Sequence, residues 1–262
     1  GFMNMRIVQL SDPHIEAPDR QPVLARDTID QLEKAVHAVN GLSPRPDCVF
    51  LTGDQTNDEA EDSFAEVKRV IGGLLMPCHL VLGNHDARVP FRRVMLEETP
   101  PSSDRYYYSF KHHGYRFIVL DTLDEGRVTG LVDTSQLAWL ESELADDEDI
   151  FTVICMHHPP VPLGIDWMDG LGLQAADRLL GIFDASPCLK LVLCGHVHHP
   201  FQIERNQVTI LTSPALSVQF RKTPLPPPTE KPYALFSDAP PAFRILDLNA
   251  QGWATTLHHL SS

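Results

Sequence analysis

The chain has 262 residues, of which 43% are hydrophobic and 21% are charged, as is usual for a globular protein. Its formal net charge of -14 argues against a sequence-independent nucleic-acid binder, which would need basic surface for the phosphate backbone. No apolar run approaches the roughly 20 residues of a membrane span, and the start shows no signal-peptide pattern. The 5 cysteines lack CxxC spacing, which is typical of free thiols in a reducing compartment. We therefore expect one cytoplasmic domain over residues 1–262 that binds neither nucleic acid nor membrane.

The first half of the chain alternates short apolar runs with segments of helical periodicity. Strands are expected at 5–12, 47–52 and 78–82. Helices are expected at 24–39 and 59–75, where apolar residues recur on one face. This β-α-β-α-β order predicts a largely parallel sheet with helices packed against it.

The second half combines hairpins with further strand and helix units. A helix is expected over 134–144, capped by Thr134 or Ser135, and another over 174–183. Expected strands comprise a hairpin of 106–110 and 115–121, single strands at 150–156 and 189–194, a return strand at 208–211 after a turn at 205–207, and closing strands at 243–248 and 254–260. The proline-rich segment 221–241 is predicted to be a long loop, either a lid, a partner-contacting loop or a plain surface excursion.

Five of the apolar strands run into Asp, Asn or His at their carboxyl ends. The seven candidate ligands are Asp12, His14, Asp54, Asn84, His157, His196 and His198. In open α/β sheets ligands collect outside the carboxyl ends of strands, so these side chains are expected to converge. Seven oxygen and nitrogen donors are too many for one tetrahedral zinc. They suit two metal ions sharing a bridging carboxylate, and the absence of thiolates favours Mn, Fe or Zn.

The strand-end residues resemble the calcineurin-like metallophosphoesterase superfamily, whose pattern is D-x-H, G-D, G-N-H-D/E, a lone H and G-H-x-H. All five blocks occur in order, as Asp12-Pro13-His14, Gly53-Asp54, Gly83-Asn84-His85-Asp86, His157 and Gly195-His196-Val197-His198. The run 157–160 and the small size further resemble the branch with class III cyclic-nucleotide phosphodiesterases and glycerophosphodiesterases. The resemblance implies an α/β fold, a four-layer αββα sandwich with two mixed sheets face to face between helices.

The resemblance also implies a two-metal centre. Its ligands would be Asp12, His14 and His198 for one ion, Asn84, His157 and His196 for the other, and Asp54 as the bridge. A hydroxide bridging the two ions would attack phosphorus. Each ligating histidine should donate its other ring N–H to a nearby acceptor.

His85 follows the candidate ligand Asn84, and the resemblance casts it as a catalytic residue outside the metal ligands. It would bind the phosphate and protonate the leaving oxygen, or bind the phosphate alone. Asp86 or Asp58 would orient its ring. Asn84 is expected to contact substrate as well.

His158 and His199 adjoin candidate ligands, so each is a candidate for a substrate contact, a supporting contact or space filling at the rim.

The expected function is hydrolysis of a 3′,5′-cyclic AMP-like nucleotide or another small phosphodiester. The alternatives are a phosphomonoesterase or broad-specificity phosphatase on the same site, and a non-catalytic scaffold, which the complete ligand set disfavours. Specificity is expected to lie in the loops at 15–23, 87–104, 159–172 and 221–241. The natural substrate and the metal pair stay open, as does a homodimer through 99–121 or the proline-rich loop.

Overall fold

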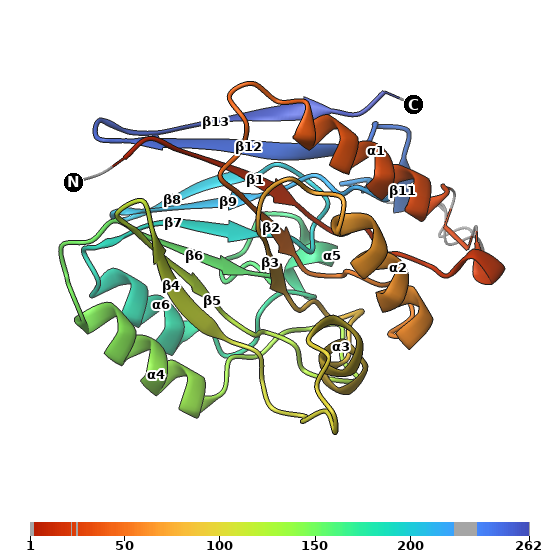
Figure 1. Ribbon diagram of the computed structural model, residues 1–262. Helices are drawn as coiled ribbons and strands as arrows, with labels where there is room; N and C mark the ends of the chain where they lie inside the picture. Colours follow the sequence, from red (N-terminus) through yellow and green to blue (C-terminus); the bar gives the residue numbers. More distant parts are fainter. Residues whose placement is uncertain (1–2, 22, 25, 223–234, 262) are drawn as a thin grey trace.

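The computed structural model describes residues 3–21, 23–24, 26–222 and 235–261. Two large sheets pack face to face (Figure 1). The strands of the first sheet are β1 (Met5–Leu10), β2 (Cys48–Thr52), β3 (Cys78–Val81), β12 (Ala242–Asn249) and β13 (Gly252–His259). Their spatial order is β13-β12-β1-β2-β3, with β1, β2 and β3 mutually parallel and β12 antiparallel to β1.

The second sheet comes from the middle of the chain. Its strands are β4 (Tyr108–His112), β5 (Tyr115–Val119), β6 (Thr152–Met156), β7 (Leu189–Cys194), β8 (Gln202–Arg205) and β9 (Val208–Thr212). They are ordered β4-β5-β6-β7-β9-β8, with a parallel centre and an antiparallel strand at each edge. A two-stranded ribbon pairs β10 (Gln219–Phe220) with β11 (Phe236–Ser237).

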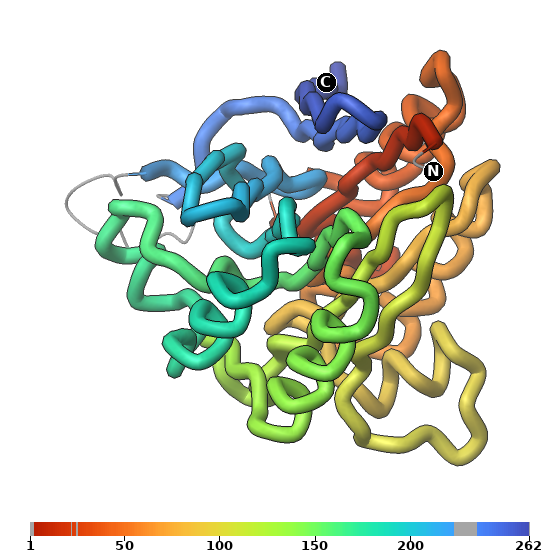
Figure 2. Tube along the Cα trace, turned by 90° about the vertical axis from the view of Figure 1, so that its left-hand side faces the viewer, coloured from red at the N-terminus to blue at the C-terminus, as the bar shows by residue number. Residues whose placement is uncertain are grey.

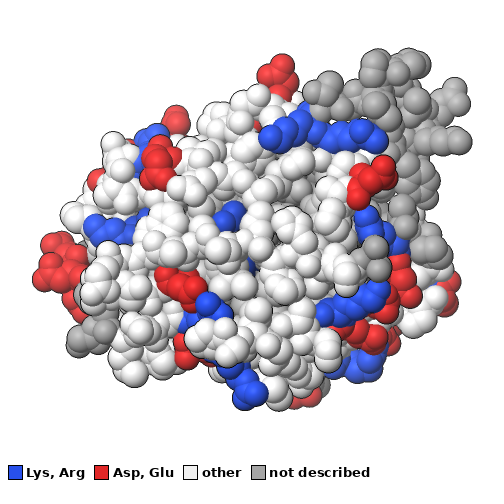
Figure 3. Space-filling model, turned by 90° about the horizontal axis from the view of Figure 1, so that it is seen from above, with Lys and Arg blue, Asp and Glu red and all other residues white. Residues whose placement is uncertain are grey.

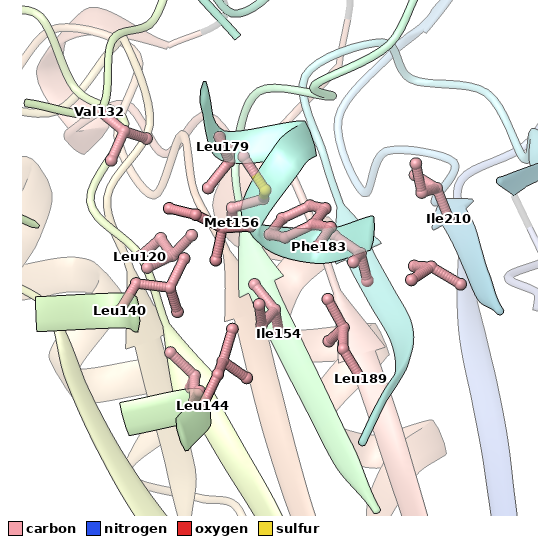
Figure 4. Packing of buried hydrophobic residues seen from close by; sticks show 14 of the residues in the cluster. Leu120, Val132, Leu140, Leu144, Ile154, Met156, Leu179, Phe183, Leu189 and Ile210 are labelled. Atoms are coloured by element: carbon pink, nitrogen blue, oxygen red, sulfur yellow. The ribbon is translucent and has the colours of Figure 1, made fainter. Parts of the chain in front are cut away.

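Helices cover the outer face of each sheet. The covering helices are α1 (Thr28–Asn40) and α2 (Glu61–Ile71) on the first sheet and α4 (Thr134–Ala145) and α6 (Asp177–Asp184) on the second. The chain also has α3 (Arg88–Met95), α5 (Asp166–Asp169) and a 3-10 helix η1 (Pro18–Arg20). One apolar layer lies between the sheets, a second joins α1 and α2 to the first sheet, and a third joins α4 and α6 to the second sheet. Figure 4 shows the third layer, in which Leu140, Leu144, Leu179 and Phe183 surround Ile154. The predicted αββα sandwich is thereby confirmed.

The closing strands complete the first sheet rather than the second. In the turned view of Figure 2 the blue C-terminal strands lie beside the red N-terminal strand, in agreement with the β1–β12 pairing. Most of the predicted proline-rich loop, 223–234, lies outside the described residues.

Several helix boundaries differ from the prediction. Helix α1 begins at Thr28 instead of residue 24, because the Asp27 carboxylate caps it by accepting from the Asp30 N–H. Asp133 caps α4 in the same way, so the expected Thr134 and Ser135 caps are wrong. Helix α2 is shorter at both ends than 59–75, and α6 begins three residues later than expected.

Helix α3 was missed, since 87–104 was predicted to be a loop. Pro90 stands in its first turn, where proline is tolerated because the first N–H groups have no partner within the helix. A proline and three arginines within eight residues hide the helical pattern.

None of the helices among the described residues is long and apolar enough to cross a bilayer. On the face shown in Figure 3, Lys and Arg are interspersed with Asp and Glu over a mostly uncharged surface. This face therefore offers no continuous basic stripe of the kind that a nucleic-acid backbone requires.

Candidate metal centre

All seven candidate ligands meet where β1, β2, β3, β6 and β7 end. The chain segments after β1 and β2 continue side by side, because the His14 N–H donates to the Asp54 carbonyl at 2.9 Å. Potential ligand atoms of Asp12, His14 and His198 lie within 4.8 Å of one another, and so do those of Asp54, His157 and His196. The prediction that these strand ends converge is confirmed.

Asp54 stands between the two groups. Its Oδ2 lies 3.3 Å from His14 Nε2 on one side and 3.3 Å from His157 Nε2 on the other. The second group also holds Asn84, whose Oδ1 is 3.2 Å from His157 Nε2 and 3.1 Å from His196 Nδ1. One carboxylate therefore faces both halves of the cluster.

Five of the seven residues have left-handed backbone conformations. Their φ angles are 52° at Asp12, 47° at His14, 49° at Asp54, 75° at His196 and 55° at His198. A non-glycine residue held there costs on the order of 1–3 kcal/mol. Such strain concentrates at functional sites, and here it turns the side chains from the sheet toward a common centre.

Glycines permit the close approach of the strand ends. A Cβ atom on Gly83 would lie 2.2 Å from the Asp54 backbone nitrogen, and one on Gly195 would lie 2.4 Å from Ser11 Oγ. The glycines of G-D, G-N-H-D and G-H-x-H are thus required by packing.

Each candidate histidine ligand uses one ring nitrogen to bind an oxygen outside the cluster. The pairs are His14 Nδ1 with Asn57 Oδ1 at 3.0 Å, His157 Nδ1 with the Thr52 carbonyl at 2.7 Å, His196 Nε2 with the Leu171 carbonyl at 2.8 Å and His198 Nδ1 with the Val218 carbonyl at 2.6 Å. A carbonyl accepts only from an N–H, so the other nitrogen of each ring faces the cluster and can offer a lone pair once it carries no proton. The predicted acceptors are present.

The electrostatics of the cluster fit positive ions. Asp12 Oδ1 and His14 Nε2 are buried without a hydrogen-bond partner among the described residues. Burial lowers the pKa of His14, but the carboxylates of Asp54 and Asp12 outweigh it and raise that pKa to about 10. Burial likewise opposes, and the same carboxylates raise, the pKa of His157 to about 9. The raised pKa values show that the buried carboxylates of the cluster favour added positive charge. Its carboxylate, amide and imidazole donors are also ligands that suit divalent metals.

His85 lies at the edge of the cluster. Its ring centroid is 4.7 Å from that of His14, and its Nδ1 is 2.9 Å from the Asn57 carbonyl. The backbone N–H of His85 donates to Asp54 Oδ1 at 2.8 Å. With Nδ1–H donated to a carbonyl, Nε2 is the ring atom left for a ligand.

The predicted orientation of His85 by Asp86 or Asp58 is wrong. The buried Asp86 carboxylate accepts from the backbone N–H groups of Gly83, Gln55 and Thr56, and so ties the loop after β3 to the loop after β2. Burial and the Asp54 charge raise the pKa of Asp86 to about 7. Asp58 instead pairs with Arg20 at 2.7 Å on the surface.

Asn57 was not recognised in the sequence. Its side-chain oxygen faces His14, its carbonyl accepts from His85, and its Nδ2 donates to Glu16 Oε1 at 3.2 Å. The only available signal was its place three residues after Asp54, which by itself assigns no role.

His158 and His199 lie beside the cluster without lining the central cavity. Both ring nitrogens of the buried His158 are engaged, Nδ1 with Thr122 Oγ1 at 2.7 Å and Nε2 with the Val128 carbonyl at 2.8 Å. Burial, with the rings of His196 and His157, holds the pKa of His158 well below its usual range. This geometry favours support of the cluster over substrate contact for His158. His199 is half-buried, and burial lowers its pKa as well.

The fold and the donors of the cluster are those expected of a metal-dependent phosphoester hydrolase. The sequence model of the calcineurin-like phosphoesterase family matches residues 5–200, and the chain belongs to this family.

Curated relatives of the chain are named as phosphodiesterases. The 3′,5′-cyclic adenosine monophosphate phosphodiesterase CpdA of Pseudomonas aeruginosa is 35% identical over 214 residues, which cover 82% of this chain and 77% of the relative. The glycerophosphodiester phosphodiesterase GpdQ of Enterobacter lignolyticus is 28% identical over 98% of this chain and 92% of its own.

Among solved structures, a dimetal phosphatase from Danio rerio superposes with a TM-score of 0.69 over 98% of this chain and 99% of its own, at 16% identity. A purple acid phosphatase from yellow lupin superposes with a TM-score of 0.67 over 100% of this chain and 52% of its own, at 15% identity. Likenesses at this identity establish the fold only.

Proposed function

We propose that the chain is a phosphodiesterase with two metal ions, and that it hydrolyses a cyclic nucleotide or another small phosphodiester. The observation that carries the proposal is the position of Asp54 Oδ2, equally far from His14 and His157. The ligand sets would be Asp12, His14 and His198 for one ion and Asn84, His157 and His196 for the other, with Asp54 shared. Bound ions would place positive charge beside the phosphate. They would also lower the pKa of water bound to them, so that hydroxide is available at neutral pH.

The cavity over the cluster favours a diester over a monoester. It has a volume of about 200 Å³, and no Lys or Arg among the described residues lines it. A phosphomonoester carries close to two negative charges at neutral pH, and its recognition usually uses Arg or Lys side chains. A diester carries one charge, which the ions alone can balance.

His85 would act on the leaving oxygen. Its Nδ1–H is held by the Asn57 carbonyl, which leaves Nε2 to carry and release the second proton. The Asp54 contact with the His85 N–H keeps the ring beside the cluster. The small phosphate ester would thus be bound by the metal ions, by Asn84 beside them and by His85.

The test compares bis-p-nitrophenyl phosphate, p-nitrophenyl phosphate and 3′,5′-cyclic AMP with protein that is stripped of metal and reloaded with manganese. Faster metal-dependent turnover of the diester, with cyclic AMP opened, supports the proposal. Faster turnover of the monoester would assign a phosphatase, and no turnover of any of the three would favour the non-catalytic scaffold.

The variant His85→Ala tests the proton donor within the same assay. Turnover should fall by roughly 10²–10⁴-fold, the usual size of general acid–base assistance, while the metal content stays at the wild-type level. Unchanged turnover would remove His85 from the mechanism. The cytoplasmic location and a homodimer remain predictions.

A further inference from the structure

Apolar side chains make up about half of the residues that line the cavity over the cluster. We call this set the apolar wall: Val128, Trp167, Met168, Leu171, Phe220 and Leu235. Apart from the candidate site residues, the described residues add no Ser, Thr, Asn, Gln or charged side chain to the lining. A polyhydroxylated or charged ester group would therefore lose its contacts with water there without gaining hydrogen bonds.

Two aromatic residues of the wall are held in place by the protein itself. Phe220 stacks on His198, with ring centroids 3.9 Å apart and an interplanar angle of 11°. Trp167 meets Phe220 edge-on at 5.6 Å and 77°, and its Nε1–H donates to the Lys222 carbonyl at 2.9 Å. The half-buried indole is thus oriented in advance by a hydrogen bond at one end and a ring contact at the other.

The two rings differ in what they have left to offer. Phe220 already has a stacked neighbour, His198. Trp167 makes only the edge-on contact among the described aromatic rings, so none of those rings stacks on its indole face. Planar ligands such as nucleobases bind to faces of this kind, because every base has a π-face and needs no specific hydrogen bond for stacking.

We infer that Trp167 is the platform for the base of a nucleoside phosphodiester, which makes nucleosides rather than glycerol or other polar alcohols the ester class for this site. This inference rests on the proposed function for the position of the phosphate. It adds a residue to that function and narrows its substrates to nucleoside esters. Phe220 then acts as a positioning residue, since it orients Trp167 and also packs on the His198 ring.

Binding of two matched ligands to metal-loaded protein tests the platform. Adenosine 5′-monophosphate and ribose 5-phosphate share the phosphate and the ribose, and only the first has a base. Stacking of one base contributes on the order of 1–3 kcal/mol, so wild-type protein should bind the adenosine compound roughly 5- to 150-fold more tightly by calorimetry. In Trp167→Ala this preference should fall to about 1, and Trp167→Phe should restore part of it.

The matched control is Trp139→Phe, because Trp139 packs against Tyr107 away from the cavity. That variant should keep the full preference. A wild-type preference near 1, or a preference that survives in Trp167→Ala, would overturn the platform.

Hydrolysis of bis-p-nitrophenyl phosphate by the same wild-type sample separates this inference from the proposed function. Metal-dependent hydrolysis without a base preference refutes the platform alone. A base preference lost in Trp167→Ala, without hydrolysis of any diester, supports the platform and refutes the proposed reaction.

Discussion

Removal of the Asn57 side chain should weaken metal binding and leave the proposed proton donor, His85, in place. Asn57 Oδ1 holds His14 Nδ1 at 3.0 Å, and Glu16 fixes the amide by accepting from its other end at 3.2 Å. In Asn57→Ala the His14 ring loses the contact that sets its tautomer and its direction. The bond to His85 survives, because it is made to the backbone carbonyl of residue 57.

The expected size of the effect follows from similar supporting contacts in metalloproteins. Loss of such a partner costs roughly 10- to 100-fold in metal affinity, which corresponds to about 1.4–2.7 kcal/mol. Calorimetric titration with Mn²⁺ measures the affinity, and diester turnover against Mn²⁺ concentration measures its consequence. Turnover at saturating metal should return close to the wild-type value.

A matched variant separates this effect from a general loss of stability. Asn40 also makes two amide contacts, donating to the Gly73 carbonyl and accepting from the Leu75 N–H, but it lies at the end of α1. Asn40→Ala should lower the urea midpoint and leave the Mn²⁺ affinity unchanged. If Asn57→Ala binds Mn²⁺ as tightly as the wild type, the orienting role of Asn57 is wrong.

Three further changes have expected outcomes. Asp54→Asn keeps the size of the side chain and removes the shared charge, so metal analysis should show impaired binding of both ions; two fully bound ions would contradict the bridging role. Arg88→Met leaves the buried Asp121 carboxylate without its bidentate partner, for which Nε lies 2.9 Å from Oδ2, and should reduce the free energy of unfolding by about 3–5 kcal/mol in urea titrations. Burial, with a smaller effect of the nearby His112, lowers the pKa of His79 to about 4, so the unfolded chain binds a proton between pH 6.5 and 4 that the folded chain does not. Stability is therefore lost as the pH falls through this window, and His79→Gln should show a smaller loss between pH 7.5 and 5.

Each stability prediction has a control on the surface. Arg178 makes an exposed pair with Glu141 at 3.2 Å, so Arg178→Met should change stability by no more than about 1 kcal/mol. A loss as small as this in Arg88→Met would show that the buried pair adds little.

His259 is exposed, and His259→Gln should leave the pH dependence as it is in the wild type. Equal curves for wild type and His79→Gln would contradict the assigned burial effect.

The parallel sheet of the first half and its covering helices could be predicted from local patterns and general rules of chain connection, whereas the four-layer order followed from the resemblance to the family. Strand β2 is apolar on both faces, with Cys48 and Phe50 on one and Val49 and Leu51 on the other, and the helical stripes between the strands require a sheet to cover. Parallel strands place their carboxyl ends together, so polar residues after each strand had to meet. The seven candidate ligands were accessible to this reasoning for that reason alone.

Helix α3 and the caps were less accessible. Asp27 and Asp133 each stand immediately before their helix. Neighbouring Asp, Ser and Thr residues can all cap a helix, and the one that does so is the one whose side chain the incoming chain places beside the free N–H groups of the first turn. This direction is set by packing of the helix on its sheet, which a local pattern does not contain.

The surroundings of the cluster could not be predicted, because their parts are distant in the sequence and carry no common pattern. Glu16 and Asn57 meet across 41 positions, and the Trp167 indole meets the Lys222 carbonyl across 55. The metal ligands violate local preferences, with histidine and aspartate in left-handed backbone, and that conflict is itself a signal of function. Asn57 and Trp167 conflict with no local rule. Their roles arise only from what the fold places beside them, so supporting and specificity residues have to be found in the structure even when the ligands are evident in the chain.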